Sequence, residues 1–368
     1  MQFKCQTNEL MEGLQTATKA LSPRTTNPIL EGVLVEAFGD EVQLICSDER
    51  LTIATRIPAE ILDPGRGVVT GRLFSEFVRR LQGGEMTVTM NQNHQFNLKC
   101  PGSVSNIAGQ EADLFPRLPV VSDEHEILLP QEMLRDMIQK TEFAIAQEDM
   151  REVLTGSYLE IANGEASMVG LDGFRLALRR AKCADLEAQV SAIIPGRALG
   201  DIGKLLNEGE DAMAALSFDG NRLHIRLDKT DIYVLLVEGE YIQYRRIIPA
   251  QFSTHVTLDL ETFKKCLDRA SLMAREGSNN LIQLRFVEGS VYIESQSQVG
   301  DVHEEMDAEQ VGGDLNIAFN VKYLTDVVRS IDTEQIELSL NGSVQPCVIT
   351  PKGDPNYLHL VLPVRTQA

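Results

Sequence analysis

The stretch AIIPGRALGDIGKLL at residues 192–206 holds a pattern that occurs three times in the chain. A short apolar run leads into a segment in which Leu199, Ile202 and Leu206 recur at the spacing of one helix face. The same frame recurs 125 residues earlier and 125 residues later. The matching positions are Phe74, Phe77 and Leu81 in the earlier copy and Leu324, Val327 and Ile331 in the later copy. An alternating run that predicts a β-hairpin follows each copy, at 86–100, 215–227 and 336–349.

A second amphipathic helix is predicted near the start of each copy. These helices occupy 8–21, 130–145 and 260–273, each after a strand-like run. Two apolar seams that agree in frame across two intervals indicate a duplication, whereas one seam alone is ordinary for an amphipathic helix. We therefore expect three copies of one α+β domain of about 120 residues, an ordinary domain size. The expected domains are 1–122, 123–249 and 250–368.

The composition is that of a folded chain without membrane spans. Hydrophobic residues make up 43% of the chain, yet no apolar run reaches the roughly 20 residues that a transmembrane helix needs. The opening MQFKCQTNEL predicts a strand and a helix, and it lacks the basic and apolar blocks of a signal peptide. The six cysteines are scattered without a CxxC pair, which argues against a zinc site or a disulfide framework. We expect a soluble protein of the reducing cytoplasm.

Charge separates the predicted helices from the rest of the chain. The formal net charge is −20, and DNA affinity comes largely from Lys and Arg that contact phosphates, so the total argues against nucleic acid. The six predicted helices together carry +3, however, which leaves −23 for everything else. Helices with an ordinary solvated face also carry Lys and Arg, so this basic set has a plain structural explanation as well.

Residue constellations for catalysis are missing from the sequence. It contains no P-loop, no HExxH, no GxSxG and no Rossmann glycine pattern after the first strand. The cluster that most resembles a metal site is Asp301, His303, Glu304 and Glu305, and it lacks a second histidine at a helical or strand spacing. We interpret it as a solvated acidic loop. We therefore expect a protein that is not an enzyme and that needs no cofactor and no metal.

Six short motifs, in order along the chain, carry a family resemblance. They are TNPILEGVLVEA at 26–37, LFPRLP at 114–119, LDGFRLAL at 171–178, QYRRIIP at 243–249, FNVKYL at 319–324 and LVLPVR at 360–365. Together they resemble the bacterial beta sliding clamp family, the beta subunit and processivity factor of DNA polymerase III. No single motif is decisive, but six in order within a threefold repeat span the chain from end to end.

The resemblance implies three DNA-clamp domains with helices on the inside and antiparallel sheets on the outside. Two chains would meet head to tail, first domain against third, and close as a homodimeric ring around duplex DNA. A ring holds DNA by topology, so its contacts need only be weak and independent of sequence. It would tether the replicative polymerase for processive synthesis as a non-catalytic subunit. It also implies a separate ATP-driven clamp loader, no membrane partner, and a place in the cytoplasm with the nucleoid.

Basic side chains on the predicted helices and loops are the candidates for transient contact with DNA phosphates. The candidates are Arg24, Arg72, Arg79, Arg197, Lys204, Lys264 and Arg269. Arg24 stands in the loop after the first helix, and Arg197 stands at a helix N-terminus, where backbone donors also favour phosphate. For each of them, an ordinary solvated side chain is the alternative.

The resemblance also implies a cleft between the second and third domains. There the polymerase, the clamp loader and repair proteins with a clamp-binding motif would insert a short apolar peptide. The matching positions are Leu154, Leu171, Gly173, Arg175, Leu176, Ile242, Arg246, Ile247, Asn320, Tyr323, Val344, Pro346, Leu360, Val361, Leu362, Pro363, Val364 and Arg365. Apolar walls suit Leu or Phe anchors, and Arg175 and Arg246 are expected to fix the peptide. Leu176, Ile247 and Val361 are equally explained as core residues.

Some positions depart from the family pattern. Phe174 stands where the family loop often has His, Ile242 where it often has Pro, and Pro346 where a small polar residue is common. Residues 366–368 extend beyond the usual end. These differences leave the preferred peptide open and do not affect the ring.

Two other classes of protein remain as alternatives. An enzyme with its site at a domain junction would need convergent titratable residues, which the sequence does not show. A protein-only scaffold that binds no DNA is disfavoured only by the mixed charge of the helices. Retention on circular but not on linear DNA separates a clamp from both.

Overall fold

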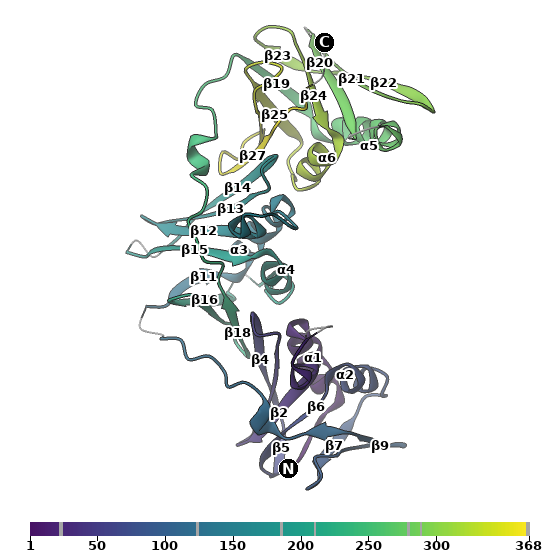
Figure 1. Ribbon diagram of the computed structural model, residues 1–368, viewed down its shortest axis with the longest axis vertical. Coiled ribbons are helices and arrows are strands. Elements are labelled where there is room, and N and C mark those ends of the chain that lie inside the picture. Colours follow the sequence, from purple (N-terminus) through teal and green to yellow (C-terminus); the bar gives the residue numbers. More distant parts are fainter. Residues whose placement is uncertain are drawn as a thin grey trace. The chain divides into compact units, whose positions relative to one another are not determined.

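The repeats of the sequence are repeats of structure. The computed structural model describes residues 1–21, 25–122, 125–184, 187–209, 211–277, 280–287 and 289–365. Within them the chain forms six α-helices and four antiparallel sheets (Figure 1). None of the described helices is long and apolar enough to cross a membrane. Contacts divide the chain into unit 1, Met1–Glu132 with Asp201–Leu236, and unit 2, Met133–Gly200 with Val237–Ala368.

Each repeat has the same order of elements: a strand, a helix, four strands, a second helix and three strands. The first repeat comprises β1 (Gln2–Gln6), α1 (Thr7–Ala17), β2 (Gly32–Phe38), β3 (Glu41–Ser47), β4 (Leu51–Pro58), β6 (Gly65–Thr70), α2 (Gly71–Arg79), β7 (Glu85–Met90), β8 (Phe96–Cys100) and β9 (Ser103–Ile107). The second comprises β11 (Ile127–Pro130), α3 (Gln131–Gln139), β12 (Gly156–Ala162), β13 (Glu165–Leu171), β14 (Arg175–Lys182), β15 (Gln189–Pro195), α4 (Gly196–Gly203), β16 (Met213–Asp219), β17 (Arg222–Arg226) and β18 (Thr230–Leu235).

The third repeat follows the same plan. It comprises β19 (Thr254–Asp259), α5 (Leu260–Glu276), β20 (Leu281–Val287), β21 (Ser290–Ser297), β22 (Gly300–Asp307), β24 (Leu315–Asn320), α6 (Val321–Arg329), β25 (Gln335–Leu340), β26 (Cys347–Pro351) and β27 (Tyr357–Val361). Three short strands are additions to the plan: β5 (Glu60–Asp63), β10 (Gly109–Gln110) and β23 (Glu309–Val311).

The sheets do not follow the repeat boundaries. Unit 1 holds a sheet of order β5-β1-β7-β8-β9 and a nine-stranded sheet of order β10-β6-β2-β3-β4-β18-β17-β16-β11. Unit 2 holds a nine-stranded sheet of order β15-β12-β13-β14-β27-β26-β25-β19-β23 and a four-stranded sheet of order β22-β21-β20-β24. The second repeat therefore gives half of its strands to each unit.

Each nine-stranded sheet is made continuous by one strand pair that joins two repeats. In unit 1, β4 of the first repeat pairs antiparallel with β18 of the second, and the Thr55 and Thr230 hydroxyls lie 2.9 Å apart across this pair. In unit 2, β14 of the second repeat pairs antiparallel with β27 of the third. There Arg179 donates to Asp354 at 2.6 Å. Among the described residues, the equivalent strands that have no such pair are β22 of the third repeat and β9 of the first.

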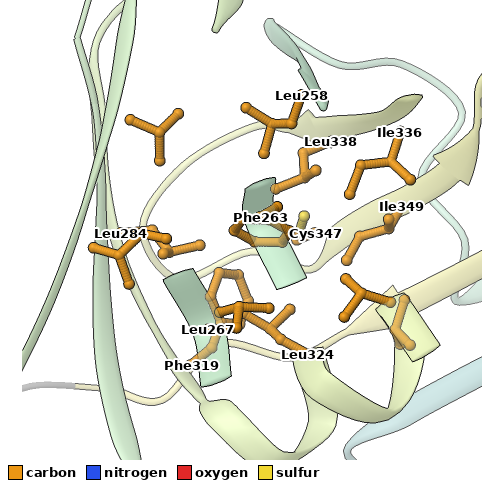
Figure 2. Packing of buried hydrophobic residues seen from close by; sticks show 14 of the residues in the cluster. Leu258, Phe263, Leu267, Leu284, Phe319, Leu324, Ile336, Leu338, Cys347 and Ile349 are labelled. Carbon is orange, nitrogen blue, oxygen red and sulfur yellow. The ribbon is translucent and has the colours of Figure 1, made fainter. Parts of the chain in front are cut away.

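The helices bury the apolar seams that the periodicity predicts, except that Phe77 and Leu81 of the first copy are half-buried. In unit 1, α1 lies beside α2 and against β3 and β4, and in unit 2, α5 lies beside α6 and against β21 and β22 (Figure 1). In the third repeat, Phe263 and Leu267 of α5 meet Leu324 of α6 in one core (Figure 2). Leu284 and Leu338 from the two sheets complete that core (Figure 2). Each domain core therefore lies between its helices and its strands.

The structure corrects two of the predicted ranges. The helix predicted over 130–145 ends at Gln139, and a separate 3-10 turn follows at Glu142–Ala144. The hairpin predicted over 336–349 spans 335–351, and residues 341–346 connect its two strands. Pro346 stands at the end of this connection, and a proline has no N–H to donate to a strand pair.

Candidate functional site

The residues expected to line a partner cleft all belong to unit 2, and they divide by exposure. Six are buried: Leu154, Leu171, Arg175, Leu176, Leu360 and Val361. Seven are half-buried: Ile242, Asn320, Tyr323, Pro346, Leu362, Pro363 and Val364. Five are exposed: Gly173, Arg246, Ile247, Val344 and Arg365. We call the half-buried and exposed residues the partner surface, since only these can contact a second molecule.

A hydrophobic cluster supports this surface. Leu154, Leu171, Leu176 and Leu360 share one core cluster, and the half-buried Ile242 packs against it. Leu176 is therefore a core residue, as its alternative explanation held, whereas Ile247 is 38% exposed and is not. Val361 belongs instead to the core of the third repeat. A rigid apolar base of this kind is a usual setting for the anchor residues of a partner.

The segment after β27 is fastened on two sides. Leu362 N–H donates to the Phe174 carbonyl, and Val364 N–H donates to the Ala318 carbonyl, each at 2.8 Å. An apolar segment without such bonds would fray. Residues 362–365 are thereby held as an ordered part of the partner surface, while residues 366–368 lie outside the described residues.

The loop before β14 presents an aromatic side chain that the expected cleft did not include. Asp172 accepts the Phe174 and Arg175 backbone N–H groups at 2.9 Å, and Gly173 adopts the positive φ of 88° that this turn requires. The Phe174 ring is 58% exposed and stacks on Tyr323, with centroids 5.9 Å apart. Its position inside the LDGFRLAL motif was the signal that could have identified it.

The two arginines expected to fix a peptide differ in their surroundings. Arg175 is 8% exposed and donates to Asp172, Asp326 and the Phe143 carbonyl. Arg246 is exposed, and its guanidinium makes no hydrogen bond or ion pair with the described part of the chain. Of the two, Arg246 is the one available to a partner.

Burial raises the pKa of the Tyr323 phenol above its usual value. The phenol therefore stays protonated at neutral pH and can donate a hydrogen bond. Together with the exposed Ile247 and Val344, it makes the partner surface apolar with a few polar groups. Such a surface is suited to binding and contains no nucleophile and base pair for catalysis.

The cations expected to face DNA lie on or beside three helices, except Arg24, which is outside the described residues. Arg72 and Arg79 lie on α2, Arg197 on α4, Lys204 just after α4, and Lys264 and Arg269 on α5. Lys264 is half-buried, and the others are exposed. Arg269 donates to Glu304 at 2.6 Å, a hydrogen bond that raises the pKa of Arg269 and lowers that of Glu304. Its charge is therefore largely offset within the chain.

The acidic segment 301–305 is an edge strand and not the loop that the sequence suggested. It forms part of β22, in which Glu304 points to α5 and binds Arg269, while His303 lies 3.2 Å from Asp301. Side chains of β22 alternate between an exposed face and a more buried face, as expected for a strand with one face toward the protein. Among the described residues, no group of three or more His, Cys, Asp or Glu could hold a metal ion.

Three copies of one α+β domain, joined by sheets that cross the repeat boundaries, define a clamp-type protein. Models of the DNA polymerase III beta subunit match the chain in all three parts. The N-terminal domain model matches residues 1–119, the central domain model 128–243 and the C-terminal domain model 245–365.

Individual proteins are similar over their whole length. The beta sliding clamp of Staphylococcus aureus (strain Mu50) is 34% identical over 376 residues, and that of Staphylococcus epidermidis is 33% identical, each with both chains fully covered. The crystal structure of the DNA polymerase sliding clamp from Bacillus subtilis has a TM-score of 0.96 at 30% identity and covers all of both chains. The beta subunit from Streptococcus pyogenes gives 0.95 at 25% identity, again with full coverage.

The chain belongs to the DNA polymerase III beta subunit family, the beta sliding clamps. It is a sliding clamp of DNA replication and a non-catalytic subunit.

A buried histidine lies in β27, the strand that leads into residues 362–365 of the partner surface. His359 is fully buried between the rings of Phe143 and Tyr357, and neither ring nitrogen has a hydrogen-bond partner within the described chain. Burial, with a smaller effect from the charge of Lys140, lowers the pKa of His359 to about 3. The ring is therefore neutral in the folded protein at physiological pH.

We expect this histidine to make the protein less stable in mild acid. Below the unfolded pKa of about 6.5, the histidine is protonated in the unfolded chain but stays neutral in the folded chain. The free energy of unfolding therefore falls by about 1.4 kcal/mol for each pH unit. His359→Leu removes this proton, so the stability of the variant relative to the parent should improve by about 2 kcal/mol from pH 7 to pH 5. Urea unfolding at both pH values measures it. The exposed His303→Leu is the control, and an equal pH dependence in parent and His359→Leu would contradict the assignment.

Proposed function

We propose that two copies of this chain close head to tail into a ring that encircles duplex DNA and tethers the replicative polymerase. The observation that carries the proposal is the pairing of strands between repeats. β4 pairs with β18, and β14 pairs with β27. In both pairs, the third strand after the first helix of one repeat meets the last strand of the next repeat. β22 and β9 occupy the equivalent positions at the edges of their sheets, which supports a third pair of this kind. A second copy supplies each with its partner.

The side chains of the two edge strands favour pairing of β22 with β9 over pairing of β22 with a second β22. β22 carries the exposed acids Asp301, Glu305 and Asp307, so two β22 strands side by side would place like charges opposite each other. β9 has the sequence SVSNI, carries no charge and exposes Val104. Head-to-tail contact therefore brings a neutral edge to an acidic one, and two such contacts close a dimer. Unpaired edges of this length otherwise invite aggregation.

The domain boundaries 1–122, 123–249 and 250–368 are part of this proposal. The equivalent elements of each repeat fall within them, from β1 to β9, from β11 to β18 and from β19 to β27. Each boundary lies in a connection between the last strand of one repeat and the first strand of the next.

Charge supports a DNA-facing role for the helices. The predicted helices carry +3 in a chain of −20, and the exposed Arg72, Arg79, Arg197 and Lys204 lie on or beside α2 and α4. A weakly basic lining lets DNA slide, while acidic outer surfaces discourage binding elsewhere. Because the sequence has no P-loop, opening is assigned to a separate ATP-driven loader. Such a protein acts in the cytoplasm, on the nucleoid.

The partner surface is the proposed docking place for the polymerase, the loader and repair proteins. Its exposed Ile247 and Val344 offer apolar contact, and Arg246 offers a cation that has no partner among the residues that the structure describes. A short peptide with an apolar anchor fits this chemistry.

Topological binding is the first expected result. The clamp should stay on nicked circular DNA after loading by the cognate loader and leave when a restriction enzyme cuts the circle, because a ring slides off a free end. Gel filtration of the labelled clamp measures retention. A linear control with protein-blocked ends should retain it. Retention on freely ended DNA would contradict the ring and favour direct DNA binding, and no association with the circle even with the loader would favour a protein-only scaffold.

An acidic residue on β9 should weaken the dimer. Val104→Asp places a carboxylate at the edge that faces β22, and we expect dimer dissociation to increase at least about tenfold, the effect of roughly 1.4 kcal/mol. Analytical ultracentrifugation measures it. Val120→Asp makes the same change at an exposed position outside the strands and should leave the dimer intact. Equal dimer strength in both variants would exclude β9 from the interface.

Loss of the Arg246 side chain, or of the residues that follow Leu362, should weaken polymerase binding. We expect Arg246→Ala, and truncation after Leu362, each to raise the Kd for the polymerase catalytic subunit about tenfold, because each removes part of one contact set. The dimer should stay intact. Arg245→Ala is the matched control, since Arg245 binds Glu160. A lost dimer with unchanged polymerase affinity would contradict the site.

A further inference from the structure

We propose that Arg175 is a positioning residue, which holds the partner surface in shape and does not itself contact the partner. The proposal rests on the proposed docking of the polymerase at this surface. It revises the expectation that Arg175 and Arg246 bind a peptide together.

Each guanidinium nitrogen of Arg175 donates to an acceptor inside the chain. Nε donates to Asp172 Oδ2 at 3.0 Å, Nη1 to Asp326 Oδ2 at 2.5 Å and Nη2 to the Phe143 carbonyl oxygen at 2.6 Å. All three nitrogens thus have an acceptor, and two of the acceptors are carboxylates. Because the side chain is only 8% exposed, a partner carboxylate would have to displace an internal one to reach it.

These three bonds join three separate pieces of unit 2. Asp172 lies in the loop between β13 and β14, Asp326 lies on α6, and Phe143 lies in the 3-10 turn after α3. The first and last pieces belong to the second repeat, and α6 belongs to the third. One planar cation with five donors can join them, whereas a lysine offers a single ammonium group.

The same guanidinium supports the aromatic part of the partner surface. It lies 4.8 Å from the centroid of the Tyr323 ring and 5.4 Å from that of Phe143. Tyr323 in turn stacks on the exposed Phe174, and the two ring planes differ by 18°. The loop that carries Phe174 is fixed by Asp172, which Arg175 also binds. Loss of Arg175 therefore loosens Tyr323 and Phe174 together.

Removal of an acceptor distinguishes positioning from direct contact. If Arg175 only positions, Asp326→Asn should weaken binding of the cognate polymerase catalytic subunit about tenfold, as should Arg175→Lys. The double variant should be no weaker than the weaker single variant, because both changes break one linkage. If Arg175 instead binds the partner, Asp326→Asn frees the guanidinium and affinity stays equal or improves. That result would overturn the proposal.

A matched control is available in an ion pair that also involves α6. Asp268 of α5 binds Arg329 of α6 at 3.3 Å, and both side chains are exposed. Asp268→Asn also removes a carboxylate that binds an arginine at α6, but away from Phe174 and Tyr323. It should change the affinity less than about twofold. An effect equal to that of Asp326→Asn would show that general loosening of α6 explains the result, and would overturn the specific role of Arg175.

A second readout works without any partner. The chain contains no tryptophan, so Phe174→Trp gives a single reporter at the aromatic stack. Arg175→Lys or Asp326→Asn in that background should shift its emission to the red and increase quenching by acrylamide, at temperatures where far-UV circular dichroism shows a folded chain. Unchanged emission and quenching would overturn the proposal. If Arg246→Ala and truncation after Leu362 also leave polymerase binding unchanged, the docking site itself is wrong, a failure separate from that of Arg175.

Discussion

Pairing of strands across the repeat boundaries is the interaction on which the rest of this structure depends. β4 with β18 and β14 with β27 turn half-sheets of neighbouring repeats into continuous nine-stranded sheets. Backbone hydrogen bonds fix the direction and register of each of these strand pairs, which we call joints. The alternation of side chains fixes which residues face the core. The proposed dimer applies the same rule to the edges of β22 and β9.

The partner surface depends on one of these joints. β27 is paired with β14, so the residues that follow it start from a fixed point and are then bound to the carbonyls of Phe174 and Ala318. Polar groups support the same joint, among them Arg179, which donates to Asp136 and to Asp354. Joining of the second and third repeats and construction of the proposed docking surface are therefore one structural feature.

Local pattern predicted the parts of the fold that depend on local geometry. Phe263, Leu267 and Leu324 lie in the core because helical spacing puts them on one face. Pairing of β14 with β27 could not be read in this way, since nothing near either strand specifies so distant a partner. The site shows the same division. Arg175 stands in a recognisable motif, but its acceptor Asp326 is 151 residues away and has no periodic relation to it.

The sheets also change what counts as a folding unit. The second repeat gives four strands to unit 1 and four to unit 2, so the stable bodies are offset by half a repeat from the copies that the sequence contains. Cooperative opening follows hydrogen-bonded neighbours and buried contacts, not ancestry. A segment cut at a repeat boundary would carry severed half-sheets with exposed edges. A single repeat therefore does not form a complete folding unit by itself. Every strand keeps the neighbours described here only in the intact chain.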